Sequence, residues 1–358
     1  MEDNRLYKEF SLTDGELRDT GYVRTPTLAQ VSILYSLGVL FLLYIGFWAQ
    51  KQSLYPGLLV TEFLLVLLPS LLLLFIFKYD MRKVLRLNKV GPLSLFIIFL
   101  IMVFAIPVVG VLNIINLALI SKVFGKVIVS SVPTASNAGE LIINLLIVGG
   151  SAGLCEEIMF RGVLQSGFER LGIKKAILIT ALLFGLFHLD FQRFLGTFLL
   201  GALIGFIVYR TNSLYAGMFA HFANNSIAVV ITYLSNKFMQ AMQGKGVGSI
   251  DAQPYAGDYF SDLFNMPAGQ LIAVFIVWFF ILAFCLSILV GLIIALVRIT
   301  SDKVHRRPIE TSGTGKTGML WLLPGLIFTA IVYIAEGFSL MGINSEIARA
   351  LTRLIRIG

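Results

Sequence analysis

Charged residues are scarce in this chain. Asp, Glu, Lys and Arg make up 13% of its 358 residues, whereas a soluble domain carries about a quarter. Hydrophobic residues make up 57% of the sequence and gather in long runs. This deficit of charge excludes an ordinary soluble globular domain and predicts a polytopic membrane protein.

Cysteine and histidine are also rare. Both cysteines, Cys155 and Cys285, lie inside apolar runs. This position argues against a structural disulfide, and two cysteines exclude a cysteine-based metal motif. The sequence has three histidines and no His-Glu-x-x-His motif, so it lacks the paired ligands of a typical zinc-protease helix.

The net charge of +8 raises the question of nucleic-acid binding. The basic residues cluster in short loops between apolar runs, where such residues set membrane topology and meet anionic lipid headgroups. We therefore expect membrane lipid, and no nucleic acid, as a partner. The sequence leaves the oligomeric state open.

Nine apolar runs predict the transmembrane helices. Most are long enough to cross about 30 Å of hydrocarbon, although two of them are short. We expect an all-α fold with eight or nine transmembrane helices. The runs are 28–49, 56–77, 92–120, 140–165, 174–189, 194–209, 213–235, 267–297 and 319–337.

The loops predict the orientation of these helices. Five basic residues lie between positions 78 and 89, and five more lie between 298 and 316. The positive-inside rule then places both clusters and the N-terminus in the cytoplasm, with the plasma membrane as the expected location. We predict six segments: a cytoplasmic lead-in at 1–27, N-terminal transmembrane helices at 28–135, a central segment at 136–236, an extracytoplasmic loop at 237–266, C-terminal transmembrane helices at 267–337 and an amphipathic tail at 338–358.

One apolar helix carries an unusual group of charges. Glu156 and Glu157 are adjacent, and Arg161 follows Glu157 by four residues, so Glu157 and Arg161 share a helix face and can pair. The helical period rotates Glu156 by about 100° from Glu157. Ionisable groups inside a membrane are costly and tend to be functional. We therefore predict a structural carboxylate beside a working one.

Two other apolar runs contribute further polar groups. His188 ends one of them. His221 and Asn225 are four residues apart in the other, so their side chains project from one helix face about 6 Å apart along the axis. Each group would cost several kcal/mol if it stayed unpaired in lipid. Together with Glu156 they most simply satisfy one another around a small hydrated cavity.

These motifs, in this order, resemble those of the CAAX protease and bacteriocin-processing family, which includes the Ras-converting CAAX endopeptidase. The resemblance covers about residues 140–235 and identifies the central segment 136–236 as the expected catalytic core. The three motifs are Glu156-Glu157-x-x-x-Arg161, Phe184-x-x-x-His188 and His221-x-x-x-Asn225.

The resemblance implies an intramembrane endopeptidase that works through an activated water molecule. No cofactor is expected, although a zinc ion held by Glu156, His188 and His221 is the alternative. The resemblance implies that Glu156 and His188 bind and activate the water, with Glu156 as the general base. It implies that His221 and Asn225 donate hydrogen bonds to the oxyanion. It also implies that Glu157 and Arg161 form a supporting ion pair.

Other residues are weaker candidates. Glu62 and Glu336 lie near the ends of their apolar runs, where we expect solvation at the membrane interface. Cys155 lies beside Glu156, but no base can be assigned to it, and we interpret it as a buried packing residue.

Two functions stay open at this stage. The first is an intramembrane endopeptidase acting on a membrane-associated protein or peptide. The second is a non-catalytic membrane protein on the same fold, either a scaffold or an immunity or regulatory protein. The sequence does not identify a substrate, and nothing in it specifies a groove for a prenyl chain.

Overall fold

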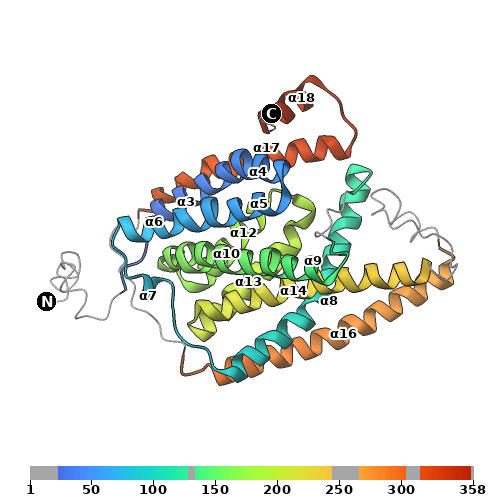
Figure 1. Ribbon diagram of the computed structural model, residues 1–358, viewed down its shortest axis with the longest axis horizontal. Helices are drawn as coiled ribbons and strands as arrows, with labels where there is room; N and C mark the ends of the chain where they lie inside the picture. The colour runs from blue at the N-terminus through green and yellow to red at the C-terminus, as the bar shows by residue number, and fades with distance from the viewer. Residues whose placement is uncertain (1–22, 128–133, 244–265, 304–314, 356–358) are drawn as a thin grey trace.

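The computed structural model describes residues 23–127, 134–243, 266–303 and 315–355. Over these ranges the chain is built from helices and contains no strand (Figure 1). Eight helical segments within them are long and apolar enough to cross a membrane, which confirms the predicted all-α polytopic fold. They are Leu28–Gln52, Leu54–Ile76, Pro92–Phe124, Ala138–Leu171, Phe191–Thr211, Leu214–Met242, Ala268–Ile299 and Lys316–Leu340.

One predicted apolar run forms a shorter helix. Helix α12 (Ile173–Phe187) has 15 residues and is therefore about 22 Å long. This is less than the hydrocarbon thickness of a bilayer. α12 packs along α13 (Phe191–Thr211), which shields one of its faces. The expected count of eight or nine helices thus resolves into eight long segments and one short helix in the described part of the chain.

The first two spans form a hairpin. The turn between them is tight, because a Cβ on Gly57 would lie 2.4 Å from backbone atoms of Gln50. The two spans therefore act as one rigid unit. Its elements are α3 (Leu28–Phe41), η1 (Leu42–Gly46), α4 (Phe47–Gln52), α5 (Leu54–Leu59), η2 (Val60–Leu67) and α6 (Leu68–Ile76).

The span from 138 to 171 carries the two adjacent glutamates. It contains a short α-helical section, α10 (Ala152–Glu157), between two π-helical sections, η3 (Leu145–Ser151) and η4 (Ile158–Leu164). π-helical turns inside helices are rare and frequent at functional sites. The span begins with α9 (Ala138–Asn144) and ends with α11 (Gln165–Phe168) and η5 (Glu169–Leu171).

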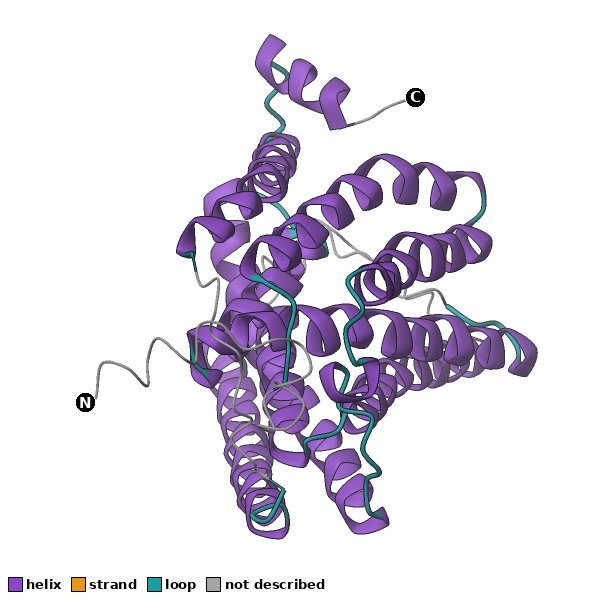
Figure 2. Cartoon of the chain, turned by 90° about the vertical axis from the view of Figure 1, so that its left-hand side faces the viewer, coloured by secondary structure: helices purple, strands orange, loops and turns teal. Residues whose placement is uncertain are grey.

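This glutamate-bearing span lies in the middle of the bundle. In Figure 1, α3 and α17 lie along one side and α8 and α16 along the other, with α10, α12, α13 and α14 between them. Figure 2 shows the same bundle from the side. The remaining elements are α7 (Met81–Val84), α8 (Pro92–Phe124), α14 (Leu214–Gln243), α16 (Ala268–Ile299), η6 (Lys316–Leu322), α17 (Leu323–Leu340) and α18 (Glu346–Ile355).

Small residues let α10 approach α14 closely. A Cβ on Gly153 would lie 3.2 Å from the carbonyl oxygen of Met218 and 3.2 Å from the nitrogen of Phe222. A Cβ on Gly149 would lie 2.9 Å from Ser226 Oγ. Such contacts between backbones are how membrane helices pack tightly. They bring the residues of α10 next to those of α14.

A buried ion pair ties the loop after the hairpin to the end of the central span. Arg86 Nη2 donates to Glu169 Oε2 over 2.6 Å, and both side chains are about 5% exposed. The carbonyl of Arg86 also accepts from the N–H of Leu214 at the start of α14, over 3.0 Å. This loop therefore fixes two of the helices that flank the central glutamates.

Parts of five predicted segments lie outside the described residues. These are most of the lead-in 1–27, residues 128–133 of the segment 28–135, most of the loop 237–266, residues 304–314 of the segment 267–337 and the last three residues of the tail 338–358. Helix α14 continues to Gln243, beyond the predicted start of that loop. The described part of the tail contains α18, which packs against α17.

Candidate active site

Glu157 and Arg161 form the predicted ion pair. Arg161 Nη1 lies 2.7 Å from Glu157 Oε1, and both side chains are fully buried. Arg161 Nη2 also donates to the carbonyl of Gly201 over 3.1 Å. The guanidinium carbon lies 4.4 Å from the centre of the Phe184 ring. A charge at this depth is tolerated because it is paired and hydrogen bonded.

His221 is the second partner of Glu157. Its Nδ1 lies 2.9 Å from Glu157 Oε1. An ionised carboxylate can only accept, so Nδ1 carries the hydrogen of this bond. The other ring nitrogen, Nε2, then points toward Glu156 and lies 3.9 Å from its Oε2. That distance is too long for a direct hydrogen bond, but one water molecule can bridge it.

Glu156 has a different environment from Glu157. Its side chain is 13% exposed, whereas that of Glu157 is completely buried. Glu156 Oε2 has no hydrogen-bond partner in the described part of the chain. Glu157 Oε2 also lacks a partner there, so the two carboxylates differ in that Glu157 is held through Oε1 by a cation and a histidine, and Glu156 is not.

His188 adjoins the same cluster through an aromatic ring. Its Nδ1 lies 2.9 Å from the carbonyl oxygen of Phe184. A carbonyl only accepts, so Nδ1 bears the hydrogen and Nε2 of the neutral ring keeps a free lone pair. The Phe184 ring centre lies 4.9 Å from that of His188 and 5.8 Å from that of His221. Both imidazoles thus pack edge to face on Phe184.

Asn225 lies one turn beyond His221 on α14. Its Nδ2 donates to the carbonyl of Val148 over 2.9 Å, and its Oδ1 accepts from Asn224 Nδ2 over 3.0 Å. One of its two N–H groups is left for another acceptor. Within the described residues it makes no hydrogen bond to Glu156. It therefore belongs to the α14 face of the site but not to the contact cluster.

Glu62 is a site residue that the sequence analysis misjudged. We expected it to be solvated at the interface, but it is 8% exposed, and its helix section η2 packs against α10, which carries Glu156. Glu62 is the ninth residue of its span, so it lies about 12 Å from the start of that span along the helix axis. Counting residues from the span start would have shown this depth. The partner helix could not be known from the sequence.

Glu336 lies near the end of its span and is partly exposed, and its solvation at the interface stays a prediction. Its carboxylate accepts from the N–H of Phe191 over 3.1 Å and from Gln192 Nε2 over 2.7 Å. These donors begin α13, where Asp190 caps the helix by accepting from the N–H of Gln192. Glu336 on α17 therefore holds the segment that directly follows His188.

Two other expectations concern cysteine and metal. Cys155 is fully buried, which confirms its interpretation as a packing residue. For zinc we considered Glu156, His188 and His221. Among the described residues, no group of three His, Cys, Asp or Glu side chains is arranged to hold a metal ion. The zinc alternative stays a prediction.

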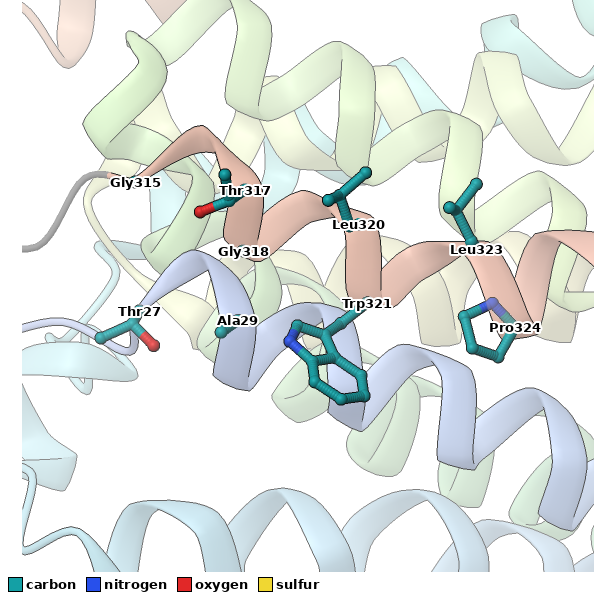
Figure 3. Close-up of a pocket in the computed structure, with 9 residues that line it drawn as sticks. All are labelled: Thr27, Ala29, Gly315, Thr317, Gly318, Leu320, Trp321, Leu323 and Pro324. Atoms are coloured by element: carbon teal, nitrogen blue, oxygen red, sulfur yellow. The ribbon is translucent and has the colours of Figure 1, made fainter.

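A surface hollow elsewhere on the molecule does not include the glutamates. It lies between the start of α3 and η6 (Figure 3). None of the predicted catalytic residues lines this hollow. Its lining residues are Thr27, Ala29, Gly315, Thr317, Gly318, Leu320, Trp321, Leu323 and Pro324.

Fold and site together define a class: a polytopic membrane protein with a charged cluster inside its helical bundle. Residues 138–227 match the model of a protein family described as type II CAAX prenyl endopeptidase Rce1-like. The central part of the chain is thus similar to the CAAX protease family, as the motifs predicted. The match contains every motif residue from Glu156 to Asn225. No curated protein and no solved structure matched the chain.

Proposed function

We propose that this protein is an intramembrane endopeptidase that hydrolyses a peptide bond of a membrane-associated protein or peptide. The observation that carries the proposal is the free Oε2 of Glu156, buried 3.9 Å from His221 Nε2 within the segment that matches the protease family. A carboxylate with a free oxygen beside a histidine is suited to hold and deprotonate water.

Glu156 is the general base in this proposal. A water molecule sits between Glu156 and His188, whose Nε2 lone pair accepts one of its hydrogens. Glu156 takes the other proton as the water oxygen attacks the scissile carbonyl carbon. The same proton then passes from Glu156 to the amine as the C–N bond breaks, so Glu156 ends in its starting state.

His221 and Asn225 stabilise the oxyanion. Because Glu157 holds the Nδ1 hydrogen of His221, this ring donates from Nε2 only when it is doubly protonated. The buried Glu157 carboxylate orients the ring, as the aspartate of a serine-protease triad does. Asn225 contributes its remaining N–H.

The test is Glu156→Gln, which keeps the shape of the side chain and removes the base. The protein termini in membranes from cells that express wild type are compared with those from cells that express the variant. A terminus that appears only with wild type marks a cleavage site. With the purified protein and a peptide spanning such a site, we expect kcat to fall by about 10²- to 10⁴-fold. A folded Glu156→Gln protein that cleaves at the wild-type rate would remove the proposed base.

Glu140→Gln is the matched control for this experiment. It makes the same chemical change on the same span, 16 residues and about 24 Å away along the helix. Glu140 instead accepts from Ser136 at the helix start. Its substitution should leave kcat unchanged.

The metal alternative is tested on the same purified enzyme. A water activated by Glu156 needs no metal, so cleavage should survive treatment with EDTA. Loss of cleavage on chelation, restored by added Zn²⁺, would instead assign the reaction to a metal-activated water.

A further inference from the structure

The turn between α12 and α13 contains His188 and has a strained backbone. Helix α12 ends at Phe187 and α13 begins at Phe191, so residues 188–190 join two helices that pack along each other. Within this turn Leu189 is buried and has a φ of 51°, a left-handed conformation that is unfavourable for a residue with a Cβ. Such strain persists only where surrounding contacts hold it, and it is frequent at functional sites.

Two carboxylates accept from the N–H groups at the start of α13. The first N–H groups of a helix have no partner inside the helix. Asp190 accepts from the N–H groups of Gln192 and Arg193 over 2.9 and 3.4 Å. The N–H of Phe191 donates instead to Glu336 on α17, over 3.1 Å. The strained turn is therefore followed by a helix start whose first N–H group depends on a different helix.

A second hydrogen bond fixes the carboxylate of Glu336. Its Oε1 accepts from Gln192 Nε2 over 2.7 Å, while its Oε2 accepts from the N–H of Phe191. Gln192 is buried, and its carbonyl accepts from Asn116 Nδ2 on α8 over 3.3 Å. Glu336 thus binds both the backbone and a side chain of the residues that directly follow the turn.

The turn also determines where the ring of His188 lies. The N–H groups of His188 and Leu189 donate to the carbonyls of Gly185 and Leu186 over 3.4 and 3.1 Å, and these bonds end α12. The ring itself is held by the carbonyl oxygen of Phe184, 2.9 Å from its Nδ1. If Leu189 relaxed to a negative φ, the backbone that carries this ring would rotate. The left-handed turn therefore has to be maintained for Nε2 to keep its direction.

We propose that Glu336 is a positioning residue of the protease. By accepting from the start of α13, it maintains the strained turn and keeps His188 Nε2 directed at the water that Glu156 deprotonates. Glu336 exchanges no proton in this role. The role rests on the proposed function, because it acts through His188. Glu336 lies on α17, outside the segment 138–227 that matches the protease family, so the match does not assign this role.

Kinetics of two variants test this role. Glu336→Leu has similar size and no acceptor, so the N–H of Phe191 and the amide of Gln192 lose this partner, and kcat should fall by about 10- to 100-fold with KM unchanged. Glu336→Gln keeps a carbonyl oxygen, and the Gln192 amide can rotate to accept from the new N–H group, so kcat should stay within about threefold of wild type. Ile334→Leu is the control, because Ile334 lies two residues away and is 50% exposed.

Other kinetic results overturn the proposal. If Glu336→Leu keeps the wild-type kcat, or if Glu336→Gln is as slow as Glu336→Leu, these hydrogen bonds do not position His188. A raised KM at constant kcat would assign Glu336 to substrate binding. If Glu336→Leu does not fold, Gln192→Met takes its place, because it removes the shorter bond to Glu336 and keeps the other. Its kcat should fall about 10-fold, and an unchanged kcat would equally contradict the role.

Nitrogen NMR of labelled histidine tests the position of His188 without any cleavage. In wild type, His188 should give the signals of a ring that carries its hydrogen on Nδ1, because Nδ1 faces a carbonyl oxygen. In Glu336→Leu these signals should shift or split into both tautomers, whereas those of His221, which Glu157 holds, should not change. The variant His188→Gln assigns the signals.

The NMR result separates this proposal from the proposed function. If the His188 signals are the same in wild type and Glu336→Leu, Glu336 does not position the ring, whether or not the protein cleaves peptides. If they change as expected but wild type cleaves nothing, the positioning of His188 stands and the proposed function fails.

Discussion

Arg161 is the residue on which the buried polar groups converge. It pairs with Glu157, donates to the backbone of α13 at Gly201, and packs over the Phe184 ring that both histidines contact. Its charge compensates one carboxylate only, which leaves Glu156 without a direct cationic partner. The pairing of Arg161 therefore distinguishes Glu157 from Glu156.

Arg161→Met should be strongly destabilising. It leaves the carboxylate of Glu157 buried and unpaired, which costs about 3–5 kcal/mol of unfolding free energy. Equilibrium unfolding in mixed micelles measures this loss. The double variant Glu157→Gln/Arg161→Met removes both charges and should regain most of the stability. If the double variant is as unstable as the single one, the ion pair is not the cause.

The sequence predicted the ion pair of Glu157 and Arg161, but it did not predict the burial of Glu62. Residues four apart on a helix must share a face, so Glu157 and Arg161 could be paired from their numbers alone. Glu62 and Glu156 are on different spans, and the burial of Glu62 depends on how the first hairpin packs against α10. Periodicity says which way a side chain points from its own helix, but not which helix it meets.

At the scale of elements, the contact between α10 and α14 sets the distance between Glu156 and His221. The two helices touch through Gly153, whose missing side chain leaves room for the backbone of Met218 and Phe222. The sequence predicted the helices themselves, since their apolar runs are long. It did not predict this contact, because a small residue does not identify the helix that it meets.

Gly153→Ala should push these helices apart. The added Cβ meets backbone atoms at 3.2 Å, and these cannot move aside without shifting α14. We expect a loss of about 1–3 kcal/mol in unfolding free energy and a lower kcat. Gly291→Ala is the matched control: Gly291 lies in another long helix, a Cβ there meets nothing within 4 Å, and the change should not destabilise. Equal effects of the two variants would contradict a specific close contact.

At the scale of the whole molecule, loop charge predicts which end of the bundle faces the cytoplasm. The basic loop at 78–89 and the end of α4 lie at opposite ends of the second span. We therefore expect the N-terminus and this basic loop inside, and the turn between α4 and α5 outside.

Cysteine labelling tests this orientation. Gln52 and Lys89 are both exposed, and the two native cysteines are buried. A membrane-impermeant maleimide should label Gln52→Cys in intact cells and Lys89→Cys only after permeabilisation. The reverse pattern would place the N-terminus outside.

The carboxylate of Glu336 has a consequence for how the molecule can be divided. It belongs to α17, beyond the segment that matches the protease family. It nevertheless accepts hydrogen bonds from two donors at the start of α13, shortly after His188. Without α17, the N–H of Phe191 and the amide of Gln192 would lose this acceptor. Residues 138–227 are thus incomplete on their own, because α17 supports the segment that follows His188. A chimaera that contains residues 138–227 must also contain an equivalent of α17.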